Sequence, residues 1–357
     1  MNNRAVIAMS GGVDSSVAAL IMKERGFDCI GVTMKLFSNE DIQISNDRTC
    51  CSLDDVEDAR SVARSLGMPH YVFNFSDKFR ECVIDRFIYA YENGMTPNPC
   101  IDCNRFLKFD KLFLRARELG CDRVVTGHYA KTEFDEASGR YLLKKGADET
   151  KDQSYVLYSM TQEQLAAAVF PLGGMTKTEI RAIAEKHGFI NAKKHDSQDI
   201  CFVPDGKYAD FIEGYTHKKY PEGDFVDTQG HVLGRHRGII RYTIGQRKGL
   251  GLSMPHPVYV SKVDPASNTV TLSKNSELFS SVLEAKDINL IPVSEMREPK
   301  RLKAKVRYRH PEAWAWVTQT GPDTIRVEFE TPQRAVTSGQ AVVLYDGDVV
   351  FGGGTII

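Results

Sequence analysis

A short apolar run that leads directly into a glycine-rich loop constrains the fold of this chain more than any other segment. Ala5–Met9 is predicted to be a buried strand, and the loop Ser10–Ser16 (SGGVDSS) follows it without a break. Apolar side chains at helical spacing then continue to Gly26. A tight turn with a serine cap is the simpler explanation. The whole motif favours a phosphate site, because glycines let backbone N–H groups approach phosphate oxygens at a helix amino end.

Strand and helix signals alternate to about residue 200. Apolar runs predict strands at 29–34, 70–75 and 123–126, and helical spacing predicts helices from Asp54 or Asp55 to Leu66, over 77–92 and over 106–119. Such alternation with short connections is typical of a parallel sheet covered by helices on both faces. The fold class of this part of the chain is therefore predicted to be α/β.

The remainder of the chain has a different character. A hairpin is predicted over 132–145, and a capping box at 176–179 begins a further helix. From about residue 205 the sequence is rich in Gly, Pro and Tyr, and from about residue 282 short β runs alternate with turn residues. We expect three domains, at 1–205, 206–281 and 282–357, the last a small barrel or sandwich.

Composition and charge exclude several classes of protein. The chain has 357 residues and a formal net charge of −1, so any nucleic-acid contact must come from local basic patches. It has no apolar run of about 18 residues, so no membrane partner is expected. The segment from Met1 lacks the apolar stretch and cleavage site of a signal peptide, and we expect a cytoplasmic protein.

Cysteine usage indicates reactive thiols. All eight cysteines lie in the first 201 residues: Cys29, Cys50, Cys51, Cys82, Cys100, Cys103, Cys121 and Cys201. In a reducing compartment, clustered cysteines are catalytic or metal-binding more often than structural. Strand, helix and strand-edge contexts make Cys29, Cys82 and Cys121 core residues.

Two cysteines in a proline-containing segment are the first reactive candidates. Two prolines in 95–104 are expected to prevent a helix there. Cys100 and Cys103 lie three residues apart just before the next predicted helix, a position that favours a thiolate. Cys201, about a hundred residues later, is the third candidate. Half of a zinc site, completed by Cys50 and Cys51, is the alternative.

The order of six motifs resembles that of bacterial tRNA-specific 2-thiouridylases, members of the PP-loop ATP pyrophosphatase superfamily. The motifs are SGGVDSS at 10–16, TPNPCIDCN at 96–104, TGHYA at 126–130, KDQSY at 151–155, SQDICF at 197–202 and YTIGQRKGL at 242–250. The resemblance runs from residue 5 to the end of the chain. It implies a Rossmann-like PP-loop domain, a small central domain and a C-terminal β-barrel.

The resemblance also implies an activity and its cofactors. The enzyme would be an ATP-dependent sulfurtransferase that makes 2-thiouridine at the wobble position of lysine, glutamate and glutamine tRNAs. Cys103 would be the catalytic nucleophile, and Cys201 would carry persulfide sulfur and then form a disulfide with Cys103. A cysteine desulfurase or sulfur relay protein would supply the sulfur. The alternative is an iron–sulfur cluster held by Cys100, Cys103 and Cys201.

Further site residues follow from the same resemblance. ATP would contact Ala8, Met9, Ser10, Gly11, Gly12, Val13, Asp14, Ser15, Met34 and Gly127, with His128 beside the nucleotide. tRNA would contact Asn98, Pro99, Cys100, Lys151, Asp152, Gln153, Arg307 and Tyr308, with Gln340 near the base. The charge of Asp14 fits a role through Mg²⁺ better than direct phosphate contact. Many relatives carry Asp where this chain has Cys100, so the proton-transfer group is not assigned here.

A basic segment near the carboxyl end is the strongest sign of RNA binding outside the motifs. Basic residues occupy every second position from Arg301 to Arg309, which on a strand makes one basic face. Tyr308 and His310 add aromatic surface suited to base stacking. A solvated outer face is the alternative. Trp314 and Trp316 share one strand face and are predicted to be core residues.

Overall fold

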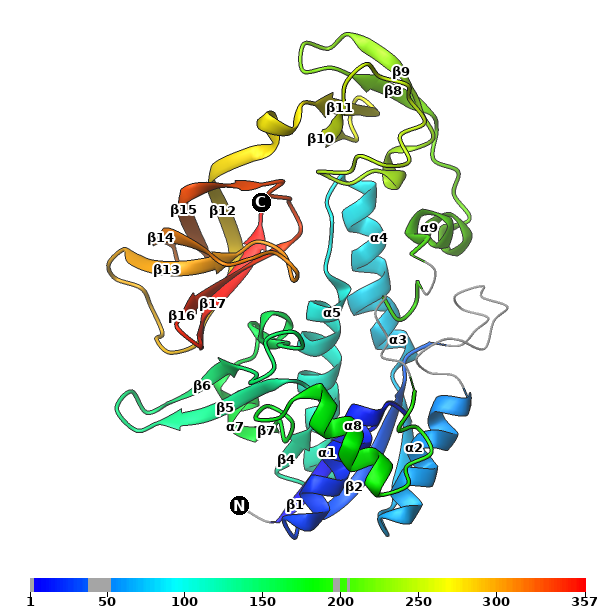
Figure 1. Ribbon diagram of the computed structural model, residues 1–357, viewed down its shortest axis with the longest axis vertical. Coiled ribbons are helices and arrows are strands. Elements are labelled where there is room, and N and C mark those ends of the chain that lie inside the picture. Colours follow the sequence, from blue (N-terminus) through cyan, green and yellow to red (C-terminus); the bar gives the residue numbers. More distant parts are fainter. Residues whose placement is uncertain (1–2, 38–52, 195–199, 204–205) are drawn as a thin grey trace.

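The computed structural model describes residues 3–37, 53–194, 200–203 and 206–357. A five-stranded parallel sheet forms the first domain, in the order β3-β2-β1-β4-β7. Its strands are β1 (Arg4–Ala8), β2 (Asp28–Lys35), β3 (His70–Asn74), β4 (Arg123–Val125) and β7 (Ala168–Val169). The predicted parallel sheet is therefore confirmed (Figure 1).

Alternate side chains of β1 explain why both faces of the sheet are covered. Ala5 and Ile7 pack with α1 (Val13–Glu24), α2 (Leu53–Ser65) and α8 (Lys177–Lys186) on one face. Val6 packs with α6 (Leu112–Glu118) on the other. A strand buried on both faces must be apolar throughout, and the sequence shows this.

Two long helical runs contain unexpected π-helical turns. The helix predicted over 77–92 consists of α3 (Ser76–Phe79), the π-helix η1 (Arg80–Ile84) and α4 (Asp85–Glu92). The second run consists of α5 (Pro99–Asp102), the π-helix η2 (Cys103–Lys111) and α6. Hydrophobic spacing located both runs but cannot distinguish one wide turn inside an α-helix.

Two helix starts differ from their predictions. Helix α5 begins at Pro99, and Asn98 caps it by accepting a hydrogen bond from the Cys100 backbone N–H at 3.2 Å. The expectation that prolines exclude helix there is wrong, because the first helical position needs no backbone N–H. Asp54 and Asp55 lie inside the first turn of α2, which starts at Leu53, so neither is its cap.

The middle of the chain forms a mixed four-stranded sheet in the order β10-β11-β8-β9. Its strands are β8 (Gly223–Val226), β9 (Val232–His236), β10 (Tyr259–Asp264) and β11 (Thr269–Ser273), accompanied by α9 (Tyr208–Thr216) and the short 3₁₀ turns η4 (Ile239–Arg241) and η5 (Asn275–Leu278). Phe225, Val260 and Val270 of this sheet join Phe79 and Phe87 of the first domain in one hydrophobic cluster. The two parts therefore share a core.

The carboxyl end forms a six-stranded barrel closed by pairing of β12 with β17. Its strands are β12 (Phe279–Leu290), β13 (Lys300–Lys305), β14 (Ala313–Gly321), β15 (Thr324–Arg334), β16 (Ala341–Asp346) and β17 (Val349–Ile356). The predicted hairpin, β5 (Ala130–Asp135) and β6 (Arg140–Lys145), joins this sheet where Lys144 pairs with Val349. Along the chain, the hairpin is followed by the 3₁₀ turn η3 (Ser154–Leu157) and helix α7 (Gln162–Ala167), and then by β7.

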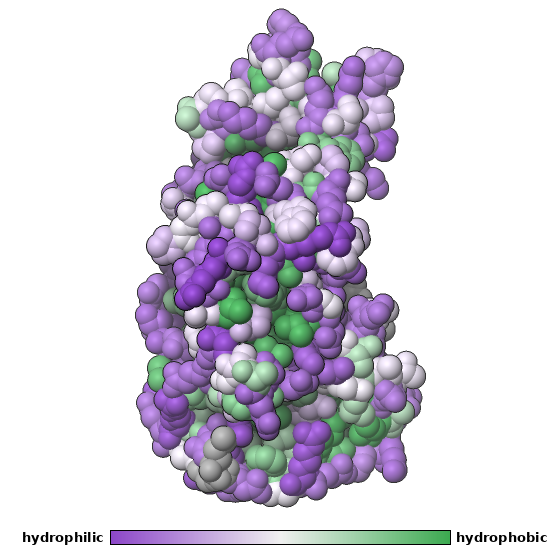
Figure 2. All heavy atoms as spheres, turned by 90° about the vertical axis from the view of Figure 1, so that its left-hand side faces the viewer, coloured by the Kyte–Doolittle hydropathy of each residue, from purple (hydrophilic) through white to green (hydrophobic). Residues whose placement is uncertain are grey.

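The barrel surface corrects two expectations. Trp314 and Trp316 are 42% and 49% exposed, so they are not core residues. They face outward because Ala313, Ala315 and Val317 take the inward positions of β14, and Trp314 stacks on the Arg301 guanidinium 4.1 Å away. This side of the molecule is mostly hydrophilic, with a hydrophobic patch near its middle (Figure 2).

Candidate active site

The glycine-rich loop between β1 and α1 has the geometry of a backbone cradle. Gly11 adopts φ +74°, and a Cβ there would overlap the backbone of Asp55. Gly12 caps α1, whose amino end therefore faces the loop. Ser15 and Ser16 both donate their hydroxyls to the Gly12 carbonyl at 3.0 Å. The two hydroxyls thus fix the loop itself, and backbone N–H groups with the helix dipole remain to hold an anion.

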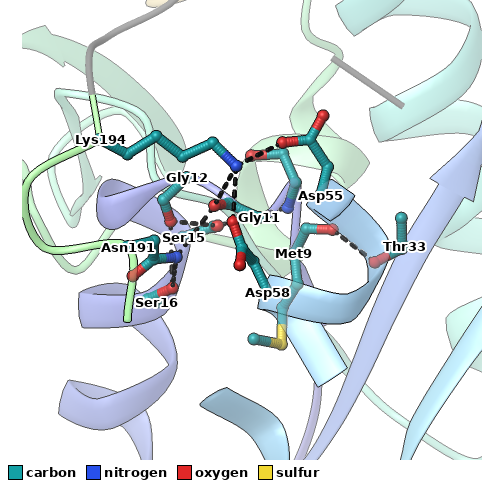
Figure 3. A network of polar contacts seen from close by, with 11 residues as sticks. Met9, Gly11, Gly12, Ser15, Ser16, Thr33, Asp55, Asp58, Asn191 and Lys194 are labelled. Atoms are coloured by element: carbon teal, nitrogen blue, oxygen red, sulfur yellow. Dashed lines mark hydrogen bonds and ion pairs between the residues drawn. The ribbon is translucent and has the colours of Figure 1, made fainter. Parts of the chain in front are cut away.

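Two side chains after α8 hold this loop from outside (Figure 3). Asn191 donates its amide to the Gly11 carbonyl and to the Ser16 hydroxyl, each at 2.9 Å. The Lys194 ammonium pairs with carboxylates of Asp55 and Asp58 at 2.6 Å. The sequence analysis missed these residues, because no local pattern relates them to a loop about 180 positions earlier.

The Asp14 carboxylate forms an ion pair with a lysine from α8. Lys177, the first residue of α8, places its ammonium 2.8 Å from each Asp14 carboxylate oxygen, and the Tyr129 hydroxyl donates to one of them at 2.7 Å. In this arrangement Asp14 joins α1 to α8, and its expected role through Mg²⁺ stays a prediction.

The other predicted nucleotide residues surround the loop at the carboxyl edge of the sheet. Ala8 and Met34 lie at the ends of β1 and β2, where ligands of parallel sheets bind. Gly127 approaches so closely that a Cβ would lie 2.9 Å from the Ser15 nitrogen. His128 is buried, its Nδ1 lies 2.7 Å from the Thr126 hydroxyl, and burial holds its pKa well below the usual value. The imidazole is therefore neutral at neutral pH.

The cysteine loop is held by the barrel. Gln340 donates its side-chain amide to the carbonyls of Thr96 and Pro97, at 2.9 and 3.2 Å. Cys100 is exposed on α5, whereas Cys103, the first residue of η2, is half-buried. Burial raises the pKa of the Cys103 thiol, and the neighbouring Asp102 adds to this effect. The expected thiolate at a helix start does not arise here, because Cys103 lies inside a continuous helical run.

Cys103 and Cys201 pack against the same hydrophobic cluster. Both contact the group that contains Phe79, Phe87 and Phe202, where the first and middle domains meet. No disulfide joins any two of the six cysteines in the described residues, so the implied Cys103–Cys201 bond is not present in this state. The two predicted reactive residues, about a hundred positions apart, therefore border one cluster, which Cys82 also borders.

The remaining cysteines are placed as follows. Cys29 and Cys121 are buried, as expected for core residues, and Cys82 is half-buried on η1. Cys50 and Cys51 lie outside the described residues. In the segments that the structure describes, no three His, Cys, Asp or Glu side chains gather as a potential metal site.

The predicted tRNA-contact residues separate into two groups. Asp152 accepts hydrogen bonds from Gly146 and Ser154, and its carbonyl accepts the Tyr308 hydroxyl at 3.1 Å. Loop 151–153 and Tyr308 are therefore adjacent. Arg307 lies beyond the end of β13 and points inward.

The Arg307 guanidinium links the barrel to the middle domain. It donates to the carbonyls of Ile244 and Ala335 at 3.1 and 2.8 Å, and to the Thr337 hydroxyl at 2.6 Å. Its position favours a structural role over direct phosphate contact.

Comparison with known proteins identifies the family. Three family models match in succession: tRNA methyl transferase HUP domain at 3–205, tRNA methyl transferase PRC-barrel domain at 209–274, and aminomethyltransferase beta-barrel domain at 280–356. The tRNA-specific 2-thiouridylase MnmA of Clostridioides difficile is 51% identical over 356 residues, covering 100% of this chain and 98% of that protein. This chain belongs to the tRNA-specific 2-thiouridylase family.

A second relative gives the same result. The MnmA protein of Lachnoclostridium phytofermentans is 49% identical and covers 99% of each chain. The 2-thiouridylase resemblance stated from the motifs is confirmed, and with it the α/β sheet followed by a middle domain and a barrel. None of the helices in the described segments has the length and hydropathy needed to cross a membrane.

Proposed function

We propose that this chain is an ATP-dependent sulfurtransferase that converts the wobble uridine of lysine, glutamate and glutamine tRNAs to 2-thiouridine. The observation that carries the proposal is the placement of Cys103 and Cys201 on one cluster, in a domain whose first loop has the geometry of an anion cradle. Family membership supports the substrate class, since the relatives are named as tRNA-specific 2-thiouridylases.

Activation of the base is the role of the glycine-rich loop. The C2 oxygen of uracil is a poor leaving group, and joining it to AMP makes it a good one. In our proposal Ser10–Ser16 holds the phosphates of ATP by backbone N–H groups, and pyrophosphate leaves as the C2 oxygen attacks the α-phosphate. Ala8, Met34 and Gly127 would border the nucleotide. Mg²⁺ would enter bound to the phosphates, because Asp14 is engaged by Lys177.

Sulfur transfer is the role of the two cysteines. A persulfide on Cys201 attacks C2 and AMP leaves. The Cys103 thiolate then attacks the Cys201 sulfur, a Cys103–Cys201 bond forms, and the electron pair of the broken S–S bond stays on the sulfur attached to the base. A thiol reductant restores both thiols. A variant in which Cys103 first liberates hydrosulfide gives the same product.

Two further partners belong to the proposal. A cysteine desulfurase or sulfur relay protein delivers the persulfide sulfur to Cys201. tRNA is bound by the middle part of the chain, residues 206–281, and by the barrel, residues 282–357, with Asn98–Cys100, loop 151–153 and Tyr308 near the target base. The base must leave its stack in the anticodon loop to reach the glycine-rich loop.

A pyrophosphate-release assay tests the activation step. The purified chain with Mg·ATP should release pyrophosphate when unmodified lysine tRNA is added, and Cys201→Ser should retain this release while forming no 2-thiouridine. Cys82→Ser, a half-buried cysteine outside the proposed chemistry, should behave as wild type in both assays. Release of pyrophosphate that does not depend on the tRNA uridine would refute the activation step.

A further inference from the structure

Two exposed tryptophans lie next to each other on the outer face of the barrel. Trp314 and Trp316 are two positions apart on β14, so their side chains point to the same side of the sheet. They are 42% and 49% exposed. Neighbouring apolar side chains of this size, left in contact with water, are typical of an interaction surface.

Basic side chains of the neighbouring strand lie beside the two indole rings. In the pairing of β13 with β14, Arg301 is opposite Trp316 and Lys303 is opposite Trp314. The Arg301 guanidinium lies 4.1 Å from the centre of the Trp314 ring, and the Lys303 ammonium lies 5.4 Å from it. The face thus combines aromatic rings with positive charge.

Lys305 continues this basic row toward the proposed position of the target base. Its ammonium lies 6.0 Å from the centre of the Tyr155 ring and 5.8 Å from that of Tyr308. The Tyr308 hydroxyl in turn donates to the Asp152 carbonyl in loop 151–153 at 3.1 Å. A strand advances about 3.3 Å per residue, so the three basic side chains of β13 cover about 13 Å between the tryptophans and this loop.

The charge of the face favours a polyanion as its partner. Three carboxylates border the face, and each pairs with a cation: Glu330 with Arg301, Glu312 with Lys145, and Glu328 with Arg326. Lys303 forms no ion pair within the segments that the structure describes. Its positive charge therefore remains available beside the indole rings.

We propose that the tryptophan surface, formed by Trp314, Trp316, Arg301 and Lys303, binds unpaired nucleotides of the tRNA anticodon loop next to the target uridine. This inference rests on the proposed function. Bases stack on aromatic rings while basic side chains bind phosphates, a combination typical of proteins that bind single-stranded RNA. A duplex keeps its base faces inside the stack, so only unpaired nucleotides can use the indole rings.

Tryptophan fluorescence tests the inference directly, because Trp314 and Trp316 are the only tryptophans in the sequence. The full-length protein is titrated with the anticodon stem-loop of lysine tRNA, without ATP or sulfur donor, while polarisation of labelled RNA follows binding. Bound stem-loop should quench the emission and protect it from acrylamide, and a duplex of the stem alone should do neither. Unchanged emission at saturating stem-loop, or equal quenching by the duplex, overturns the inference.

Substitutions give a second test. Trp316→Ala should bind the stem-loop about tenfold more weakly, and Trp316→Phe should keep most of the affinity, because a phenyl ring also stacks on a base. Lys303→Gln should weaken binding and reduce its dependence on salt. Tyr71→Ala, which removes an equally exposed aromatic ring from β3, should bind as wild type. Wild-type affinity in Trp316→Ala overturns the inference, and the quenching measurement decides it if this variant does not fold.

The remaining outcomes separate this inference from the proposed function. Normal RNA binding by Trp316→Ala with slower sulfur transfer from a cysteine desulfurase overturns the inference and assigns the surface to that protein partner. Absence of 2-thiouridine with the wild-type chain refutes the proposed function, whereas quenching by the stem-loop would still establish an RNA-binding surface at the two tryptophans.

Discussion

In the glycine-rich loop, the contacts of individual side chains differ from those that the motif predicts. Ser15, Ser16 and Asp14 belong to the loop that suggested phosphate binding, yet their side chains bind the protein itself. Their partners Lys177 and Asn191 come from the other end of the domain. A motif therefore identifies the loop, whereas the residues that stabilise it depend on tertiary contacts.

The half-buried carboxyl of Asp102 yields a prediction about pH. Burial raises its pKa from 3.8 to about 6. The folded protein therefore binds more protons than the unfolded chain between these values, and stability falls as pH rises through this window. Asp102→Asn removes this dependence. The unfolding free energy of wild type relative to Asp102→Asn should fall by roughly 2–3 kcal/mol from pH 4 to pH 7.

Urea unfolding of both proteins at the two pH values measures this difference. A difference between wild type and Asp102→Asn that stays constant from pH 4 to pH 7 would show that the carboxyl is not buried in solution.

At the level of elements, the glycine-rich loop depends on close backbone contact with α2. Gly11 and Gly26 both have positive φ, but only Gly11 has a neighbour that a Cβ would overlap. Gly26→Ala should cost about 1 kcal/mol, from backbone strain alone. Gly11→Ala should displace the loop and abolish tRNA-dependent pyrophosphate release. Equal effects of the two substitutions on pyrophosphate release would contradict this account.

The sequence predicted the elements better than their details. Strands β1 to β4, the hairpin and the capping box of α8 follow from local apolar spacing and turn residues, and all are present. The π-helical turn that starts at Cys103 and the helix start at Pro99 were not predicted. A wide turn changes no residue type, so apolar spacing in the sequence cannot reveal it.

For the whole molecule, the barrel contributes to the site in the first domain. Hairpin β5–β6 extends the barrel sheet, Arg105 near Cys103 binds Asp287 of β12, and Gln340 holds loop 96–97. These contacts join segments up to 244 positions apart, which a single sequence cannot indicate. The three predicted domains therefore give no indication that barrel residues hold segments of the first domain in place.

Gln340 provides a test of this cooperation. Gln340→Met keeps the volume but removes both hydrogen bonds to the loop, each worth about 1 kcal/mol. We expect weaker tRNA binding and a lower rate of thiolation, with normal ATP binding. Thiolation kinetics with varied tRNA measure both effects. Unchanged kinetics would show that the loop holds its position without the barrel.

The central claim is that Cys103 and Cys201 transfer sulfur to a uridine activated by ATP. Nucleoside mass spectrometry of unmodified tRNA incubated with the chain, Mg·ATP and a sulfur donor tests it most directly. We predict one 2-thiouridine for each AMP formed, and none with Cys103→Ser or Cys201→Ser. Undiminished 2-thiouridine with Cys201→Ser, or its absence with the wild-type chain, would contradict the claim.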